Sequence, residues 1–307
     1  MLKSFLLVAS AAVLVITPAL AQKREDGVWH FRGDNGEIVH VFATPENAEA
    51  FAHRFALIEF QTRSNGYTVY GSSYGSTPGQ LNDHGGAVVS NAAFQPIFYN
   101  AATAASLQAA IDSMVNNFSN SDPGMKVITQ YSKSGNAISA SLGHAADFVD
   151  SKTAPRTISD SAIRTFLTGL FNAHSVTPTT NTIYGVYLPS GTTSTTGSAR
   201  SCTSYCGYHS SYTYNGMTIL YAVFPYLTCS GCSLSGKTVV DMETIVTSHE
   251  IREAITDPVN AWWESSSGYE ADDKCAWHNL YQQAGGAWVQ PEYSNALAGW
   301  PRGCVTP

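Results

Sequence analysis

The sequence predicts an α/β or α+β fold in which a mixed sheet is packed with helices and the C-terminal third carries disulfides. From residue 86 onwards, apolar stretches of strand length alternate with segments of helical periodicity, which is typical of a sheet covered by helices. All six cysteines fall in the last third of the 307 residues. With 44% hydrophobic residues, a chain of this length can bury a core without help from a metal.

The beginning of the chain is typical of a cleaved secretory signal. Lys3 is followed by an apolar stretch over residues 5–16 and by small residues up to Ala21, the order of features that such signals share. The apolar stretch is shorter than the ~20 residues that span a bilayer. We therefore expect residues 1–21 to be removed, the protein to be secreted and extracellular, and the mature chain to have no membrane span.

Residues 22–62 predict a small N-terminal unit. Apolar and polar residues alternate over 28–42 on both sides of a Gly-Asp-Asn-Gly turn, which indicates a β-hairpin, and 45–60 predicts a helix. The Gly, Ser, Tyr and Asn of residues 63–85 indicate a linker. We interpret the leading unit as a propeptide or an accessory module, followed by a main domain over 86–307.

The main domain is predicted to alternate strands and helices. Apolar and β-branched runs predict strands at 87–90, 95–99, 126–131, 183–188 and 218–224. Helical periodicity predicts helices at 104–117, 159–174 and 239–255. The Ser, Thr and Gly residues of 189–204 predict a loop.

The cysteines predict three disulfides, because an even number of them in an exported chain is typical of a disulfide framework. We expect the pairs Cys202–Cys206, Cys229–Cys232 and Cys275–Cys304. The alternative is a four-thiolate zinc site made by the first four cysteines, whose spacing permits it. Export favours the disulfides, since structural bridges are typical of oxidising compartments.

The charge pattern argues against nucleic acid as a partner. The net charge is −7, and the sixteen Lys and Arg residues are scattered rather than clustered. A phosphate backbone is bound by a basic patch or stripe, and the sequence contains none.

The segment 239–255 predicts a helix that carries the chemistry. It is apolar on more than one face and Pro258 ends it, so we expect it to be largely buried. His249 and Glu253 are four residues apart, which places both side chains on one face, where they can bind one ion. This is the zincin-like H-E-x-x-H zinc helix with the second His replaced by Glu, whose carboxylate is still a zinc ligand.

The neighbouring acidic residues complete the predicted site. Glu250 takes the position of the general base that removes a proton from water. Glu270, seventeen residues beyond Glu253, is the expected third ligand, since thermolysin-like enzymes complete their zinc site with a downstream carboxylate. Asp257 and Asp273 are alternative ligands or hydrogen-bond partners of the imidazole. The opposing interpretation is an exposed charged helix face with ion pairs only.

His209 is a second candidate for catalysis. It lies in the segment 205–210, which we expect to be a loop tethered by the cysteines, and it is placed to donate a hydrogen bond to an oxyanion. The alternative is a packing role in an aromatic loop. We expect Tyr208, Tyr212 and Tyr214 to line a cleft.

Several motifs occur in the order of a known family. They are Gly86–Asn91, Cys202–Ser210, Ser248–Pro258, Val259–Trp262 and Glu270–Cys275. Together they resemble the EXORDIUM or phosphate-induced protein family over roughly residues 85–307. The leading unit, residues 22–80, does not take part in the resemblance.

The resemblance implies a secreted protein of a family best known from plant cell walls and also found in bacteria and fungi. Many members carry H-E-L-x-E followed by T-N-P or T-D-P, which His249, Glu250, Glu253 and the segment 256–258 match. Some members lack the His-Glu pair, which implies that the fold persists without the site. The family's biochemical activity is not established.

Two functional hypotheses follow. The first is a secreted zinc-dependent hydrolase, in the first place a metallopeptidase, acting on a protein or cell-wall substrate outside the cell: His249, Glu253 and Glu270 bind the metal, Glu250 activates water, and His209 stabilises the oxyanion. The second is a non-catalytic extracellular or cell-wall protein in which the same carboxylates hold a structural ion, such as calcium, or none. Calcium prefers about six to eight oxygen ligands and seldom takes His, so zinc is the expected metal.

Overall fold

The computed structural model describes residues 30–32, 37–52, 60–64, 67–71, 79–119, 121–265, 267–295 and 302–307. The expected signal segment 1–21 and the Gly-Asp-Asn-Gly turn lie outside the described residues. Within the described ranges, no helix combines the length and apolar character needed to cross a membrane.

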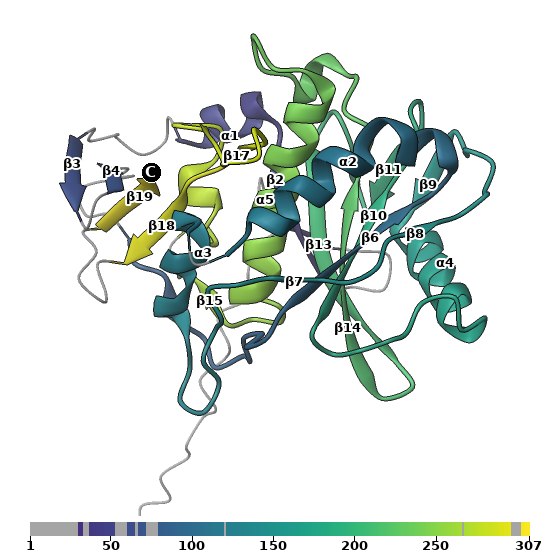
Figure 1. Cartoon of the computed structure of the whole chain (residues 1–307), viewed down its shortest axis with the longest axis horizontal. Coiled ribbons are helices and arrows are strands. Elements are labelled where there is room, and N and C mark those ends of the chain that lie inside the picture. Colours follow the sequence, from purple (N-terminus) through teal and green to yellow (C-terminus); the bar gives the residue numbers. More distant parts are fainter. Residues whose placement is uncertain are drawn as a thin grey trace, which may run out of the picture.

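A mixed eight-stranded sheet forms the centre of the molecule (Figure 1), as the sequence predicts. Its order is β1-β2-β13-β14-β10-β6-β7, and β8 also pairs with β6. Strands β14, β10, β6, β7 and β8 are parallel, whereas β13, β2 and β1 extend the sheet in antiparallel pairings. The bounds are β1 (His30–Arg32), β2 (Ile38–Ala43), β6 (Ala93–Phe98), β7 (Gly143–His144), β8 (Phe148–Val149), β10 (Thr182–Tyr187), β13 (Tyr205–Tyr214) and β14 (Met217–Phe224).

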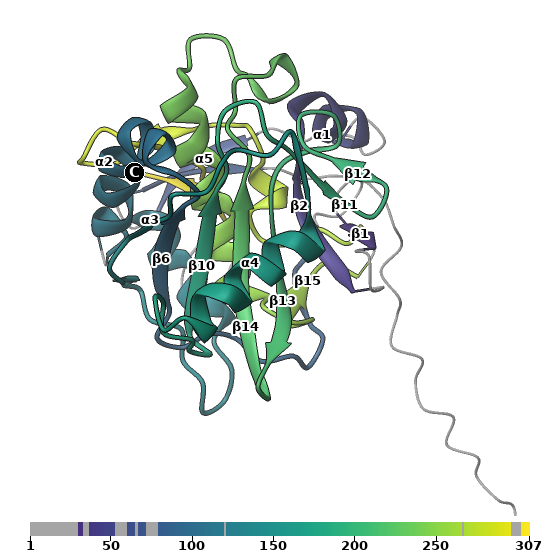
Figure 2. The ribbon, with the colours of Figure 1, turned by 90° about the vertical axis from the view of Figure 1, so that its right-hand side faces the viewer.

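Helices cover both faces of this sheet. Helix α4 (Asp160–Asn172) crosses one face in Figure 2, while α2 (Ala101–Asn117) and α5 (Val239–Thr256) lie behind the sheet on the other. Alternate side chains of β10 enter two different cores, Ile183 on the α2–α5 side and Tyr184 on the α4 side. A strand that is buried on both faces reads as a continuous apolar run, which is why the sequence predicted β10 well.

Smaller elements surround the central sheet. Figure 1 shows α5 between the central sheet and a four-stranded sheet of order β18-β19-β4-β3. These strands are β18 (Glu292–Asn295), β19 (Arg302–Thr306), β4 (Tyr67–Gly71) and β3 (Phe60–Ser64). The other short elements are α1 (Pro45–Ala52), β5 (Asn82–Asp83), α3 (Pro123–Ile128), η1 (Thr129–Tyr131), β9 (Thr157–Ser159), β11 (Thr193–Thr196), β12 (Ala199–Arg200), η2 (Ser230–Cys232), β15 (Trp262–Trp263), η3 (Asp273–Cys275), β16 (Tyr281–Gln282) and β17 (Trp288–Val289).

The predicted helices begin at hydrogen-bonded caps. Ser159 accepts a hydrogen bond from the backbone of Ala162 at the start of α4. At the start of α5, Thr238 and Asp241 form a capping box in which each side chain bonds the other's backbone. Such caps satisfy N–H groups that the first turn of a helix leaves free.

Some local predictions are wrong. Residues 126–131 are not a strand but the end of α3 and the 3-10 turn η1, because Asp122 caps α3 and Pro123 occupies its first turn. Residues 87–90 contain no strand, and the predicted loop 189–204 contains β11 and β12. The segment 205–210 is not a loop but the first half of β13.

The leading unit shares the central sheet. The predicted hairpin is present, with Phe31 opposite Val39, and β2 pairs with β13 from Ala43 to His40. The predicted helix is present as α1, while 53–59 lie outside the described residues. In the segment predicted as a linker, β4 pairs with the C-terminal strand β19. Two sheets therefore cross the boundary that the sequence predicts at 63–85.

Three disulfides join segments distant in sequence. They are Cys202–Cys229, Cys206–Cys232 and Cys275–Cys304. The third pair is the predicted one, but the predicted pairs Cys202–Cys206 and Cys229–Cys232 are wrong. The segment around η2 lies against the start of β13, where a β-carbon on Gly231 would be 2.0 Å from the Cys202 carbonyl oxygen, so each cysteine faces the other segment. These four sulfurs are therefore not free thiolates for a zinc site.

The disulfide pattern gives a direct test. A chymotryptic digest of the unreduced protein, cut after Tyr205, is expected to yield separate peptides that contain Cys202 and Cys206, each joined to the segment 229–232. Fragmentation within that segment in the mass spectrometer should assign Cys202 to Cys229 and Cys206 to Cys232. The contrary result is a Cys202–Cys206 bridge, which would join those two peptides to each other and leave the segment 229–232 as a separate peptide with its own internal bridge.

Glu243 on α5 predicts a pH dependence of stability. It is buried and accepts a hydrogen bond of 2.9 Å from the backbone of Leu227, and burial raises its pKa to about 8. A raised folded-state pKa contributes stability that is present below the unfolded-state pKa and is lost as the pH rises through about 8. Glu243→Gln is therefore expected to raise the free energy of unfolding relative to the wild type at alkaline pH and not at acidic pH.

Urea unfolding at about pH 5 and about pH 9, on either side of this titration, measures the difference. Glu46→Gln, at an exposed position of α1, is the matched control for the removal of a carboxyl group. A constant difference between Glu243→Gln and the wild type at both pH values would contradict the assignment.

Candidate metal site

Helix α5 packs closely on the central sheet because β13 carries a glycine where the two meet. A β-carbon on Gly207 would lie 2.4 Å from Val246 Cγ1 and 3.2 Å from Glu250 Oε1. Only a residue without a side chain permits this approach. The close contact brings β13 and its residue His209 to the face of α5 that carries His249 and Glu253.

His249 and Glu253 point to the same place. Their atoms Nε2 and Oε2 are 2.9 Å apart, and both side chains are almost completely buried, at 0% and 1% exposure. Yet neither nitrogen of His249 has a hydrogen-bond partner among the described residues. The two groups are close without the alignment of a hydrogen bond, which is the relation expected of two ligands of one ion.

Asp273 completes a group of three with them. Its Oδ1 lies 3.8 Å from His249 Nε2 and has no hydrogen-bond partner in the part of the chain that the structure describes. The rest of the residue is firmly held, because Oδ2 accepts 2.9 Å from the Glu270 backbone and the Asp273 N–H donates 3.0 Å to Glu253 Oε1. The ligand atoms of His249, Glu253 and Asp273 all lie within 4.8 Å of one another.

Glu270, the third ligand expected from the sequence, is held by two imidazoles instead. Its Oε2 lies 3.0 Å from His209 Nε2, and its Oε1 contacts Nδ1 of His40. The rings of His40 and His209 stack with centroids 4.7 Å apart. This group is linked to the first by Glu253, whose Oε2 is 3.7 Å from His209 Nε2.

Sequence reasoning missed His40. It lies more than two hundred residues before His249 in the chain, and it reaches the site because β2 pairs with β13 and places His40 directly opposite His209. Its position within an alternating strand gave no sign of a polar partner. Only the strand order brings it there.

Glu250 lies beside both groups and has no hydrogen-bond partner for either carboxylate oxygen among the described residues. It is fully buried, and burial raises its pKa well above the ordinary value. Its carboxylate forms a further possible ligand group with His209 and Glu253. An unpaired buried carboxyl group of this kind is costly, so a ligand or a reaction has to account for it.

The electrostatics of the group fit a cation. Burial lowers the pKa of His249 to about 3 and raises those of Glu253 and Asp273 well above their ordinary values. Burial also opposes a charge on His209, but Glu270 and Glu253 outweigh it and raise its pKa to about 9. Without a cation, this imidazole stays neutral and the carboxyl groups resist ionisation. A divalent cation would stabilise the ionised carboxylates beside the neutral imidazole, because metal binding favours deprotonated ligands.

An ion pair behind the site fixes the loop that carries these acids. Arg252 donates 2.6 Å to Asp272 Oδ1, and its Nε lies 3.2 Å from Glu292 Oε2. All three side chains are buried. Through Asp272, the pair holds the segment that contains Glu270 and Asp273 against α5.

Two expectations from the sequence are placed elsewhere. Asp257 is the C-terminal cap residue of α5, and its side chain accepts a hydrogen bond from the backbone of Ala261, so it belongs to none of the groups above. Tyr208 points to the α4 side of the sheet and donates to Asp160, and Tyr212 and Tyr214 pack against the same core. These tyrosines therefore do not line the site of His209, because successive residues of a strand face opposite sides.

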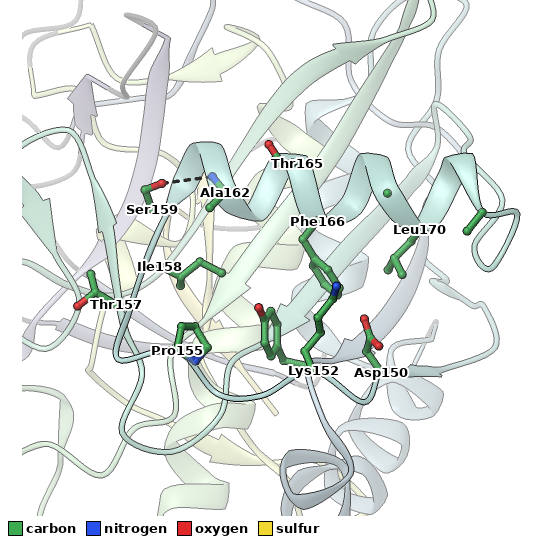
Figure 3. Close-up of a pocket in the computed structure, with 13 residues that line it drawn as sticks. Asp150, Lys152, Pro155, Thr157, Ile158, Ser159, Ala162, Thr165, Phe166 and Leu170 are labelled. Atoms are coloured by element: carbon green, nitrogen blue, oxygen red, sulfur yellow. Dashed lines mark hydrogen bonds between the residues drawn. The ribbon is translucent and has the colours of Figure 1, made fainter.

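Tyr212 and Tyr214 do line a cleft, a cavity of about 690 Å³ beside α4, as expected from the sequence. Two other cavities are relevant to the site. One of about 220 Å³ is lined by Glu37, His40, Ser210 and Val259, and His40 is the residue through which it touches the site. A larger one of about 730 Å³ lies between α4 and the segment before it (Figure 3), where Phe166 and Lys152 line it. The larger cavity contains none of the candidate ligands.

Comparisons with known proteins leave the site to be judged on its geometry. No family model, curated protein or solved structure matches the chain.

The buried ion pair predicts a large effect on stability. Arg252→Ala leaves Asp272 and Glu292 buried without their cation, and loss of one partner of a buried pair costs about 3–5 kcal/mol. Thermal or urea unfolding measures it. Lys133→Ala, which removes the partner of the more exposed Asp83, should cost about 1 kcal/mol or less. Equal effects of the two substitutions would contradict this account of Arg252.

Proposed function

We propose that the chain is a secreted zinc-dependent hydrolase, in the first place a metallopeptidase, with α5 as its zincin-like helix. The observation that carries the proposal is the pair His249 Nε2 and Glu253 Oε2, 2.9 Å apart on one helix face without a hydrogen bond between them. Asp273 Oδ1 and the unpaired carboxyl group of Glu250 lie beside them.

Secretion is supported by the covalent structure. Three disulfides close loops around the site-bearing domain, and such bridges persist in oxidising compartments. The signal-like beginning of the sequence points the same way. Membership of the EXORDIUM family, which rests on the motifs in the sequence, is part of this proposal.

The residues present suit zinc. An imidazole nitrogen and carboxylate oxygens are ordinary zinc ligands, and a catalytic site uses three of them. We assign the three ligand positions to His249, Glu253 and Asp273. Glu270, which contacts His209, is the alternative to Asp273 as the third ligand. Zn²⁺ in such a site polarises a carbonyl group and lowers the pKa of a water molecule.

The chain itself supplies the proton transfers. Glu250 is the general base, because its carboxyl group lies beside the proposed ligands and neither of its oxygens has a hydrogen-bond partner among the described residues. His209 is the group that stabilises an oxyanion, since Glu270 and Glu253 keep its pKa at about 9, which makes it a cation at neutral pH. The proposed substrate is a protein or cell-wall component outside the cell.

A second candidate function is favoured by burial. His249, Glu250, Glu253, Glu270 and Asp273 are each 2% exposed or less, and closed sites are typical of structural metals. The same ligands would then hold a structural ion in a non-catalytic extracellular protein. The imidazole makes zinc a better occupant than calcium in this case too.

Metal content and activity separate the two candidates. The wild type is expected to bind one zinc ion and His249→Ala to lose it, whereas His278→Ala, an exposed imidazole, should keep it. Glu250→Gln should retain zinc and lose about 10²- to 10⁴-fold in peptide hydrolysis, the usual contribution of a general base. Elemental analysis and a protease assay with and without chelator measure both.

Zinc without any hydrolysis, both in the intact wild type and in protein whose strand β2 has been released, would favour the structural candidate. Equal zinc in the wild type and His249→Ala would remove the site altogether.

A further inference from the structure

We propose that β2 occupies the place of an extended polypeptide substrate on β13, with Phe42 in the pocket that receives an aromatic side chain of that substrate. The inference rests on the proposed hydrolase function and deepens it. It names the substrate class of the site and the segment that keeps the site closed.

The backbone of β2 lies on β13 as an added peptide strand would. The two strands are antiparallel, from Ala43 opposite Tyr205 to His40 opposite His209. The part of β13 that β2 covers includes Gly207, which packs against α5. Without β2, the N–H and C=O groups of this stretch would be free to pair, and proteins commonly bind extended peptides by adding a strand to such an edge.

Each side chain of β2 that faces the site contacts one or more of its functional residues. Residues 40 and 42 share a face of the strand. His40 contacts Glu270 and stacks on His209, and Phe42 lies on the ring of His249. The intervening Val41 enters the core on the α4 side instead.

Phe42 fills a flat slot. Its ring stacks on His249 at 3.8 Å and 10° on one side, and on Trp277 at 4.0 Å and 8° on the other. Trp277 is fixed beside β2 by a 3.0 Å hydrogen bond from its Nε1 to the Ala43 carbonyl. A slot between two parallel rings accepts a planar side chain best, so the substrates that fit are polypeptides with Phe, Tyr or Trp at this position.

The site cannot receive a polypeptide while β2 is in place. Phe42 is fully buried, His249 and Glu250 are 0% exposed, and the cavity that reaches His40 measures about 220 Å³. Pockets that take even small organic ligands usually measure about 300–1,000 Å³. Hydrolysis therefore requires that β2 leave β13, and the residues of β2 lie outside the 85–307 segment that carries the family motifs.

The test uses the full chain, loaded with zinc, with the recognition sequence of a site-specific protease inserted after Ala52. Hydrolysis of internally quenched peptides that carry Phe or Ala at one position is measured before and after the cut. Cutting is expected to raise the rate by about tenfold or more, because the closed state no longer dominates, with Phe peptides preferred. A synthetic peptide of residues 37–44 should restore the inhibition, and its Phe42→Ala form should bind about tenfold more weakly.

Equal rates before and after the cut, with no inhibition by the peptide, would overturn the inference and leave the hydrolase proposal standing. If neither form hydrolyses peptides although both bind zinc through His249, the hydrolase proposal fails. Binding of the 37–44 peptide to the cut protein then tests whether β13 accepts an extended polypeptide in place of β2. Fluorescence anisotropy of the labelled 37–44 peptide with the cut Glu250→Gln protein is expected to show uptake that depends on Phe42. Absence of uptake overturns the inference.

The unmodified chain provides a measurement without any insertion. Hydrogen exchange of the zinc-loaded protein should show β2 amides exchanging about tenfold or more faster than those of the neighbouring central strand β14, as local opening requires. Equal protection of β2 and β14 would make β2 an ordinary part of the core and would overturn the inference.

Discussion

The site depends on a buried imidazole and a buried carboxyl group that share one turn of α5 and do not satisfy each other. His249 and Glu253 are held at 2.9 Å without a hydrogen bond, which an apolar interior tolerates poorly. The surrounding structure imposes this arrangement. Gly207 lets β13 approach α5, and Arg252 of α5 binds Asp272 in the loop that carries Asp273.

The same burial that makes the group costly also makes it useful. In a low-dielectric interior, a cation interacts strongly with carboxylates, and a free carboxyl group keeps a raised pKa. Glu250 combines that raised pKa with two oxygens that have no hydrogen-bond partner among the described residues. This combination supports the proposed role of Glu250 in proton transfer beside a metal, and β2 with Phe42 is the element that covers the site.

Much of the fold could be predicted because its signals are local. The capping residue Ser159 marks the start of α4, and the continuous apolar run of β10 marks a strand that is buried on both faces. Predictions failed where a local signal was outweighed: the β-branched residues near 126–131 suggested a strand, but Asp122 and Pro123 start a helix there. The spacing of the cysteines suggested local bridges, whereas the bridges link two segments packed against each other.

The helix that carries His249, Glu250 and Glu253 could be predicted from the chain alone, because a spacing of four residues fixes which side chains share a helix face. The residues that meet that face could not be predicted in this way. In the folded structure, Asp273 lies beside His249 and Glu270 contacts His209. His40 reaches the site from a strand near the other end of the chain. Those contacts depend on strand order and loop course, which are set by long-range packing and leave no periodicity in the sequence.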